Sequence, residues 1–214
     1  MARPGGGNAS PATEIMSANV PESKAAWRRQ IREALKQVSP AQRTVDSEKI
    51  RQLLQVQPAW INARAVLLFV PLASEPDIRP LLARALNDGK SVALPRFSAD
   101  GGIYQSCQIR DSERGLHPGP FGVLEPDAAL PILPANQLDF TLVPGIGFSL
   151  VGGRLGRGQG HYDRLLAEVS GFKCGVAFEC QVVASLPMEP HDVQLNCILT
   201  PARWHVVSPA PALK

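Results

Sequence analysis

The sequence predicts an α/β protein: one Rossmann-like domain with three-layer α/β/α architecture and a mostly parallel sheet. Two observations lead to this prediction. Short, continuous apolar runs at 65–70 and 140–143 are typical of strands that are buried on both faces of a sheet. Apolar residues at helical spacing lie between such runs, so strands and helices alternate along the chain.

Two helices are predicted before the first strand. Ser23 is suited to cap the first helix, in which Trp27, Ile31 and Leu35 recur every four residues. Ser39 followed by a proline predicts the start of the second helix, because proline is favoured at the first helical position. The predicted apolar face of this second helix consists of Val45, Ile50, Leu53 and Leu54.

A βαβ unit is predicted next, with strands at 65–70 and 91–94. The helix between them is marked by Ile78, Leu81, Leu82 and Ala85. Residues 97–137 are richer in Gly, Pro and polar residues and contain one candidate strand. The remaining predicted elements are a strand at 103–109, a strand at 140–143, a glycine-rich loop, a helix at 161–169, and strands at 174–178 and 204–207.

Sites in such sheets lie beyond the carboxyl ends of the strands. We therefore expect the segments that follow strands to converge there: 71–75, 95–96, 144–161 and 179–181.

The tails differ in composition from the predicted domain. Residues 1–21 are rich in Gly, Pro, Ser and Ala and lack apolar periodicity, which predicts a disordered N-terminal tail. Residues 208–214 carry two prolines and are expected to be a loose C-terminal tail. A single folded domain is predicted over 22–207.

Composition excludes several classes of protein. With 22 Lys and Arg against 19 Asp and Glu, the net charge is +3, too small to indicate a nucleic-acid partner. No apolar run approaches the roughly 18 residues that span a bilayer, and the first twenty residues lack a signal-like apolar core. A cytoplasmic protein with no membrane partner is expected. The four cysteines form no CxxC, which favours free thiols over a zinc site.

The most informative segment is the glycine-rich stretch 143–163. Gly156, Gly158 and Gly160 alternate just before a predicted helix, whose N-terminus favours anions. Arg154 and Arg157 supply charges suited to phosphate oxygens. Together these features indicate a polyphosphate cradle, although the glycines alone are equally compatible with a structural turn. Neither GxxxxGK[ST] nor GxGxxG is present.

Further candidates are isolated acidic and basic residues. Asp163 and Asp192 are suited to hold Mg²⁺ beside phosphates, or to serve as a helix-terminal charge and a loop cap. Lys24 and Arg28 share one helix face, which either meets an anion or is solvated. Glu75 either accepts hydrogen bonds from an amide-like or guanidine-like edge of a substrate or is an exposed loop acid.

These residues carry a resemblance to the 5-formyltetrahydrofolate cyclo-ligase family, also called methenyltetrahydrofolate synthetases. The family loop reads approximately PGxxFDxxGxRLGxGxGYYD, and most of its fixed positions occur at 144–163. The family's KxxLR resembles 24–28, its glutamate after the first strand resembles Glu75, and its P-x-x-F-G-I-x-E-P resembles 118–126. The C-terminal aspartate resembles Asp192, so the likeness spans 24–200.

The resemblance implies ATP- and Mg²⁺-dependent closure of 5-formyltetrahydrofolate to 5,10-methenyltetrahydrofolate, with release of ADP and phosphate. In that reaction the formyl oxygen takes the γ-phosphate of ATP, and N10 then attacks the activated carbon. A monomer is expected rather than an oligomer. The implied catalytic residues are Arg154 and Tyr162, and the implied Mg²⁺ ligands are Asp163 and Asp192. The implied ATP-binding residues are Lys24, Arg28, Gly153, Arg154, Leu155, Gly156, Arg157, Gly158, Gln159, Gly160, His161 and Tyr162. The implied substrate-binding residues are Val70, Glu75, Arg157, Gly158, Gln159, Gly160 and His161.

Four residues depart from the family pattern: Ser149, Gln159, His161 and Asn196. Ser149 is still able to cap a turn as the usual aspartate does, and the His161 ring is still able to stack or donate a hydrogen bond. These departures leave open a non-catalytic folate- or nucleotide-binding protein on the same scaffold. A third alternative is a sugar-phosphate isomerase-like or acyl-transfer protein of similar architecture, since fold does not fix function.

Overall fold

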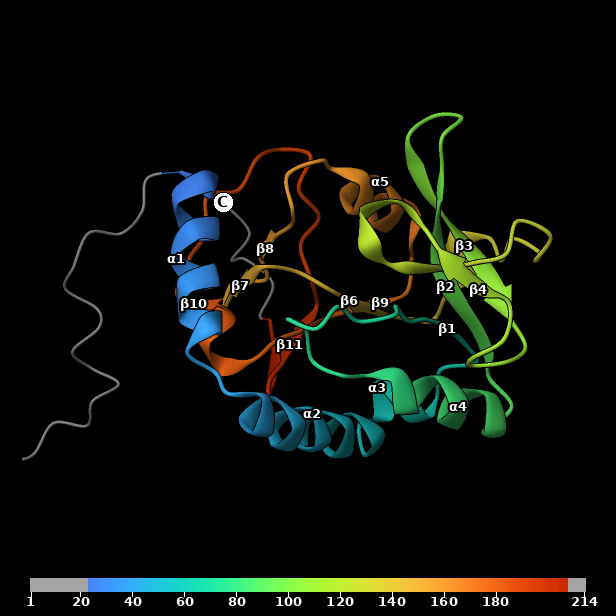
Figure 1. The fold of residues 1–214 in the computed structure, drawn as a ribbon, viewed down its shortest axis with the longest axis horizontal. Helices are drawn as coiled ribbons and strands as arrows, with labels where there is room; N and C mark the ends of the chain where they lie inside the picture. The colour runs from blue at the N-terminus through green and yellow to red at the C-terminus, as the bar shows by residue number, and fades with distance from the viewer. Residues whose placement is uncertain (1–22, 208–214) are drawn as a thin grey trace, which may run out of the picture.

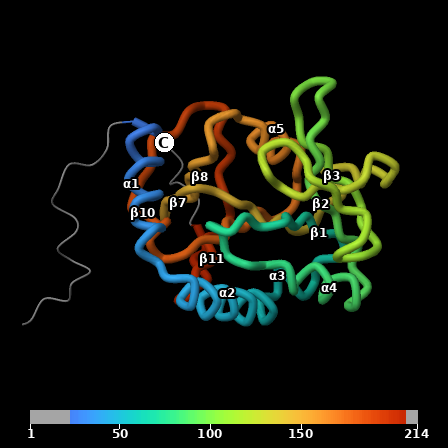
Figure 2. Tube along the Cα trace, in the orientation of Figure 1, coloured from blue at the N-terminus to red at the C-terminus, as the bar shows by residue number. Residues whose placement is uncertain are grey.

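The computed structural model describes residues 23–207, and the predicted tails lie outside the described residues. Its centre is a seven-stranded sheet in the order β12-β11-β9-β6-β1-β2-β3 (Figures 1 and 2). Five neighbouring strands run parallel, and one antiparallel strand closes each edge. The parallel strands are β1 (Ala65–Leu67), β2 (Ser91–Ser98), β6 (Phe140–Val143), β9 (Phe172–Val176) and β11 (Cys197–Leu199), and the edge strands are β3 (Ile103–Ile109) and β12 (Trp204–Val206). The predicted mostly parallel α/β sheet is confirmed.

Helices cover both faces of this sheet. Alternating side chains of β1 and of the residue after it show the two layers, because Val66 and Leu68 pack in one core cluster and Leu67 packs in another. The first cluster lies against α2 (Pro40–Gln55), α3 (Pro58–Ile61) and α4 (Arg79–Asn87), and the second lies against α5 (His161–Glu168) (Figure 1).

The first helix, α1 (Lys24–Lys36), lies at one end of the sheet and covers a second, three-stranded sheet (Figure 1). Ser23 caps it as predicted, with its Oγ accepting from Ala26 N at 3.2 Å. Trp27, Ile31 and Leu35 are buried, and each contributes about 1.5–3 kcal/mol if its side chain is fully removed from water. The three-stranded sheet consists of β10 (Val182–Val183), β7 (Gly147–Ser149) and β8 (Arg154–Leu155).

Some predicted elements are wrong in detail. The segment 144–160, predicted as a loop, contains β7 and β8, which are too short to show any periodicity. Val45, predicted on the apolar face of α2, is 50% exposed. The strand expected at 91–94 continues to Ser98 by pairing with β3. Elements that the sequence did not predict are α3, β4 (Leu116–Pro118), β5 (Leu124–Pro126), β10, β11 and the 3-10 turns η2 (Pro120–Gly122), η3 (Ala135–Gln137) and η4 (Glu179–Gln181).

The strand order places a topological switch point between β1 and β6. From β1 the chain adds β2 on one side, and then β6, β9 and β11 are added in turn on the other side. In open α/β sheets, ligands bind in the crevice beyond the carboxyl ends of the strands at such a point. The four cysteines are free thiols, as predicted. Within residues 23–207, no helix has the length and apolar character to cross a membrane.

Candidate active site

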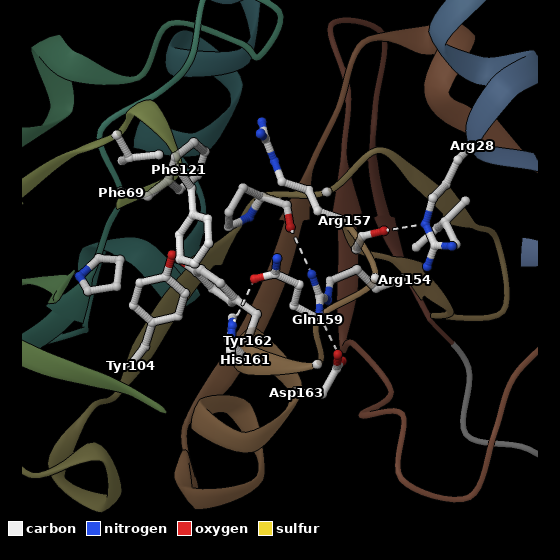
Figure 3. A pocket seen from close by; sticks show the side chains of 18 of the residues that line it. Arg28, Phe69, Tyr104, Phe121, Arg154, Arg157, Gln159, His161, Tyr162 and Asp163 are labelled. Carbon is white, nitrogen blue, oxygen red and sulfur yellow. Dashed lines mark hydrogen bonds and ion pairs between the residues drawn. The ribbon is translucent and has the colours of Figure 1, made fainter. Parts of the chain in front are cut away.

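A cavity of about 670 Å³ opens at this switch point. Its floor includes Phe69 and Val70, which follow β1, and Pro144 and Gly145, which follow β6. Figure 3 shows that the cavity has two chemically different sides. Arginines gather on one side and aromatic rings on the other. The glycine-rich segment just before α5 contributes to both sides.

The glycine-rich segment 156–160 bends where the cavity meets α5. Gly158 and Gly160 have φ of 105° and 66°, which L side chains rarely adopt, whereas Gly156 has no positive φ. Gly160 is the N-cap residue of α5, so the backbone N–H groups of the first helical turn lie at the cavity. The predicted combination of glycines, arginines and a helix N-terminus is therefore present at one place.

The N-terminal helix supplies cations to the same cavity. Arg28 Nε donates to Gly156 O at 2.8 Å, which joins α1 to the glycine-rich segment. Lys24 Nζ lies 2.6 Å from Asp192 Oδ2 and 3.5 Å from Glu189 Oε1. Lys24 and Arg28 thus face the cavity from one side of the helix, as the four-residue spacing predicts.

A buried ion pair forms the base of the arginine side. Arg154 Nη2 lies 2.7 Å from Asp163 Oδ1, and the two side chains are 4% and 15% exposed. The Arg154 guanidinium also lies 5.5 Å from the ring centroid of Tyr162. Burial raises the pKa of Tyr162 well above its usual range, so the Tyr162 hydroxyl stays protonated at neutral pH. That hydroxyl has no hydrogen-bond partner among residues 23–207.

The aromatic side was predicted only in part, because His161 and Tyr162 were candidates and Tyr104 and Phe121 were not. The His161 ring lies 4.9 Å from Phe97 and 5.8 Å from Phe121, and Tyr104 lies 5.5 Å from Tyr162. Among the described residues, Phe121 alone of the non-glycine residues has positive φ, at 68°. The likeness of 118–126 to a family motif is the one signal that could have found Phe121.

The hydrogen bonds of His161 tie the aromatic side to the cradle. His161 Nε2 lies 2.9 Å from Gln159 Oε1, and Nδ1 lies 2.7 Å from Gly102 O. Two residues that depart from the family pattern therefore contact each other inside the cavity. His161 brings a polar ring to a position where the family commonly has tyrosine.

Two glutamates line the cavity, Glu75 from the segment after β1 and Glu125 from β5. Glu75 Oε2 accepts from Leu72 N at 3.0 Å, and Oε1 lies 3.5 Å from Arg157 Nη2. Burial raises the pKa of Glu75, although the Leu72 N–H and Arg157 oppose the shift. Burial likewise raises the pKa of Glu125, whose Oε2 accepts from Phe97 N while Oε1 has no partner within residues 23–207. Glu125 was not predicted as a site residue.

Metal-ligating groups gather near Asp192. Ligand atoms of Glu189, His191 and Asp192 lie within 4.8 Å of one another. Burial raises the pKa of Asp192, but Lys24 and the Glu189 N–H together hold it below its usual value. Asp163, the other predicted Mg²⁺ ligand, lines the same cavity and is paired with Arg154. Two carboxylates facing one cavity are the hard oxygen donors that Mg²⁺ prefers, so the donor set fits this ion.

All but one of the predicted site residues line the cavity. The exception is Gly153, where a Cβ would lie 2.7 Å from Ser149 Oγ and 2.9 Å from the Met188 sulfur. Gly153 is thus packed inside the protein and does not line the cavity, so its role at the ATP site stays a prediction. Its N–H donates to Ser149 Oγ at 2.9 Å, so Ser149 does cap this turn. Asn196 also lies away from the cavity, where its Oδ1 accepts from Lys173 N.

Comparisons with known proteins give a consistent result. The chain matches the 5-formyltetrahydrofolate cyclo-ligase family over residues 20–201. It is 35% identical to the 5-formyltetrahydrofolate cyclo-ligase of Mycolicibacterium smegmatis over 190 residues, covering 86% of this chain and 96% of the relative. The corresponding enzyme of Escherichia coli K12 is 29% identical over 183 residues, covering 81% and 97%.

A solved structure supports the same grouping. The 5,10-methenyltetrahydrofolate synthetase of Aquifex aeolicus superposes with a TM-score of 0.78 at 30% identity, covering 89% of this chain and 96% of that one. The chain therefore belongs to the 5-formyltetrahydrofolate cyclo-ligase family.

Proposed function

We propose that the cavity binds ATP and 5-formyltetrahydrofolate together and transfers the γ-phosphate between them. As a member of its family, the chain is an enzyme that converts 5-formyltetrahydrofolate to 5,10-methenyltetrahydrofolate. The observation that carries the proposal is the two-sided cavity, with arginines opposite aromatic rings. Arginines and a helix N-terminus suit polyphosphate, and a flat pterin ring suits the aromatic side.

The arginine side holds the nucleotide in this proposal. Arg28, Arg154 and Arg157 neutralise phosphate charge, and the backbone around Gly158 and Gly160 donates N–H groups to phosphate oxygens. Phosphoryl transfer depends mainly on positioning and charge neutralisation, and preformed donors supply both. The Asp163 carboxylate fixes Arg154 before any ligand arrives.

The folate lies on the other side. Glu75 accepts hydrogen bonds from the amide-like edge of the pterin, while Val70 and the aromatic rings pack against the ring faces. The formyl oxygen attacks the γ-phosphorus, the bond to the bridging oxygen breaks, and ADP leaves. N10 then attacks the formyl carbon, loses its proton, and the C–O bond breaks to release phosphate. Tyr162 lines the same cavity, and its buried hydroxyl stays protonated in this proposal.

Mg²⁺ is the cation that these residues fit. Asp163 and Asp192 would hold it, and the bound ion would neutralise charge on the transferred phosphate. Lys24 already contacts the Asp192 carboxylate, so a bound ion would have to displace the Lys24 ammonium group from it. Asp192→Asn should raise the Mg²⁺ concentration needed for half-maximal ATP binding, while an unaltered metal titration would remove Asp192 from the metal site.

The test is ADP release that depends on 5-formyltetrahydrofolate. Wild-type protein should release one ADP for each methenyl product formed, and neither ligand alone should give turnover. The Arg29→Gln variant should release ADP as the wild type does, because Arg29 is an exposed arginine of α1 that does not line the cavity. ADP release without 5-formyltetrahydrofolate, at an equal rate, would contradict the proposal.

The non-catalytic alternative has less support than the sequence suggested. Of the four departures, Ser149 caps a turn outside the cavity and Asn196 joins two strands. Only Gln159 and His161 lie in the cavity. Bound ATP and folate without any product would favour that alternative.

A further inference from the structure

A second, smaller cavity of about 320 Å³ adjoins the active cavity. None of the roles described above uses it as a separate binding site. Four residues line both cavities, so the two are contiguous: Arg32, Glu75, Gly145 and Arg157. The ion pair between Glu75 and Arg157 lies at this junction.

Cations predominate in the lining of the smaller cavity. Arg32, Lys36, Arg43 and Arg157 face it, and Glu75 is its one carboxylate. Burial raises the pKa of Glu75, which disfavours the charged form that would balance these cations. The lining therefore carries an excess of positive charge.

Arg43 is a fixed cation in this lining. Its guanidinium donates to three backbone carbonyls: Leu35 O at 2.6 Å, Ala73 O at 2.9 Å and Val38 O at 3.1 Å. None of these acceptors carries a full charge, and no carboxylate of the described residues lies within 4.0 Å of it. A guanidinium held this way is a preorganised hydrogen-bond donor for an anion, because its side chain loses little freedom when the anion binds.

Arg32 continues a basic face of α1 into the smaller cavity. Lys24, Arg28, Arg32 and Lys36 are spaced by four residues and share one face of the helix. The first two line the active cavity, Arg32 lines both, and Lys36 lines the smaller one. Lys24 is paired with Asp192 and Lys36 with Glu33, but Arg32 has no acidic partner among residues 23–207. Like charges at this spacing repel unless an anion lies between them.

We propose that the smaller cavity is an oxyanion-binding subsite adjoining the active centre. This proposal rests on the proposed cyclo-ligase function, because the reaction supplies two oxyanions that could bind here. One is the orthophosphate released at ring closure, and the other is a carboxylate of the glutamate tail of the folate. Both are recognised by the same guanidinium and ammonium donors.

The first arm of the test is direct binding of inorganic phosphate, measured by calorimetry at low ionic strength with saturating ADP to occupy the nucleotide cradle. Arg32→Gln/Lys36→Gln should weaken phosphate affinity by about three- to tenfold, since two exposed charged contacts are lost. Arg29→Gln/Lys49→Gln removes the same charge from exposed positions outside both cavities and should leave affinity unchanged.

The second arm uses mono- and pentaglutamyl 5-formyltetrahydrofolate without ATP. If the tail is the ligand, the Arg32→Gln/Lys36→Gln variant loses affinity for the pentaglutamate several-fold more than for the monoglutamate. A loss confined to phosphate identifies the released product as the ligand. Unchanged affinity for both oxyanions would overturn the proposal. Failure of wild-type protein to bind ADP would instead contradict the proposed function, so the two failures are distinguishable.

Discussion

Arg28 and Gly156 are 128 residues apart in the chain, yet Arg28 Nε donates to Gly156 O at 2.8 Å. This bond connects the first helix to the glycine-rich segment at the position where both meet the cavity. A Cβ at Gly158 would also lie 3.4 Å from the Arg28 guanidinium, so the two segments are closely packed. The proposed nucleotide cradle is therefore assembled from segments that are far apart in the sequence.

Arg28→Gln should weaken ATP binding. The substitution removes a charge-assisted contact and the bond that positions Gly156, which together correspond to about tenfold or more in dissociation constant. Calorimetric titration with ATP measures the effect, with Arg29→Gln as the control of equal charge on the same helix. Equal ATP affinities in the two variants would show that Arg28 is not part of the cradle.

Arg154→Gln should destabilise the fold as well as weaken ATP binding. It leaves the Asp163 carboxylate without its partner, which costs about 3 kcal/mol for a buried ion pair. Asp163→Asn in the same chain should restore part of the loss, because no uncompensated charge remains. Denaturant unfolding of the two single variants and the double variant measures this coupling. Strictly additive losses would mean that the pair does not interact.

The affinity for folate should depend on pH through Glu75. Burial raises the pKa of Glu75 above its ordinary value of 4.5, so the carboxylate forms only at higher pH than usual. Folate affinity in the wild type should therefore rise as pH increases through this raised pKa. Glu75→Gln should be weaker and should lack this limb of the profile. A variant profile with the same acidic limb would assign the titration to another group.

Glu125→Gln should gain stability relative to the wild type as pH rises. Burial raises the pKa of Glu125 in the folded protein, so its stabilising contribution is complete below 4.5 and is lost as pH rises through the folded pKa. Glutamine still offers an oxygen to Phe97 N and has no such loss. The difference in melting temperature between variant and wild type should grow between pH 4 and about 7. A constant difference would contradict this account.

The sequence predicted the parts of the fold with clear periodicity. Trp27, Ile31 and Leu35 recur every four residues and define α1, and the apolar run at 140–143 defines β6. It did not reveal β7 and β8, because strands of two or three residues are determined by their partners rather than by a local pattern. The three-stranded sheet on which α1 packs was therefore missed.

The candidate site was predicted unevenly for a similar reason. The glycine-rich segment is continuous, so its cradle was visible in the sequence. The aromatic side includes Tyr104, Phe121 and His161, which come from separate segments and meet only in the folded chain. Gly153 matches the family loop but packs against Ser149, so a position in that motif need not line the cavity.

The most direct test of the central claim is the absorbance of the methenyl product formed from 5-formyltetrahydrofolate, with and without MgATP. We expect product only when MgATP is present, and its amount should be limited by whichever of ATP and folate is scarcer. Product formation at the same rate without ATP would contradict phosphoryl activation. No product from folded protein that binds both ligands would contradict the cyclo-ligase reaction itself.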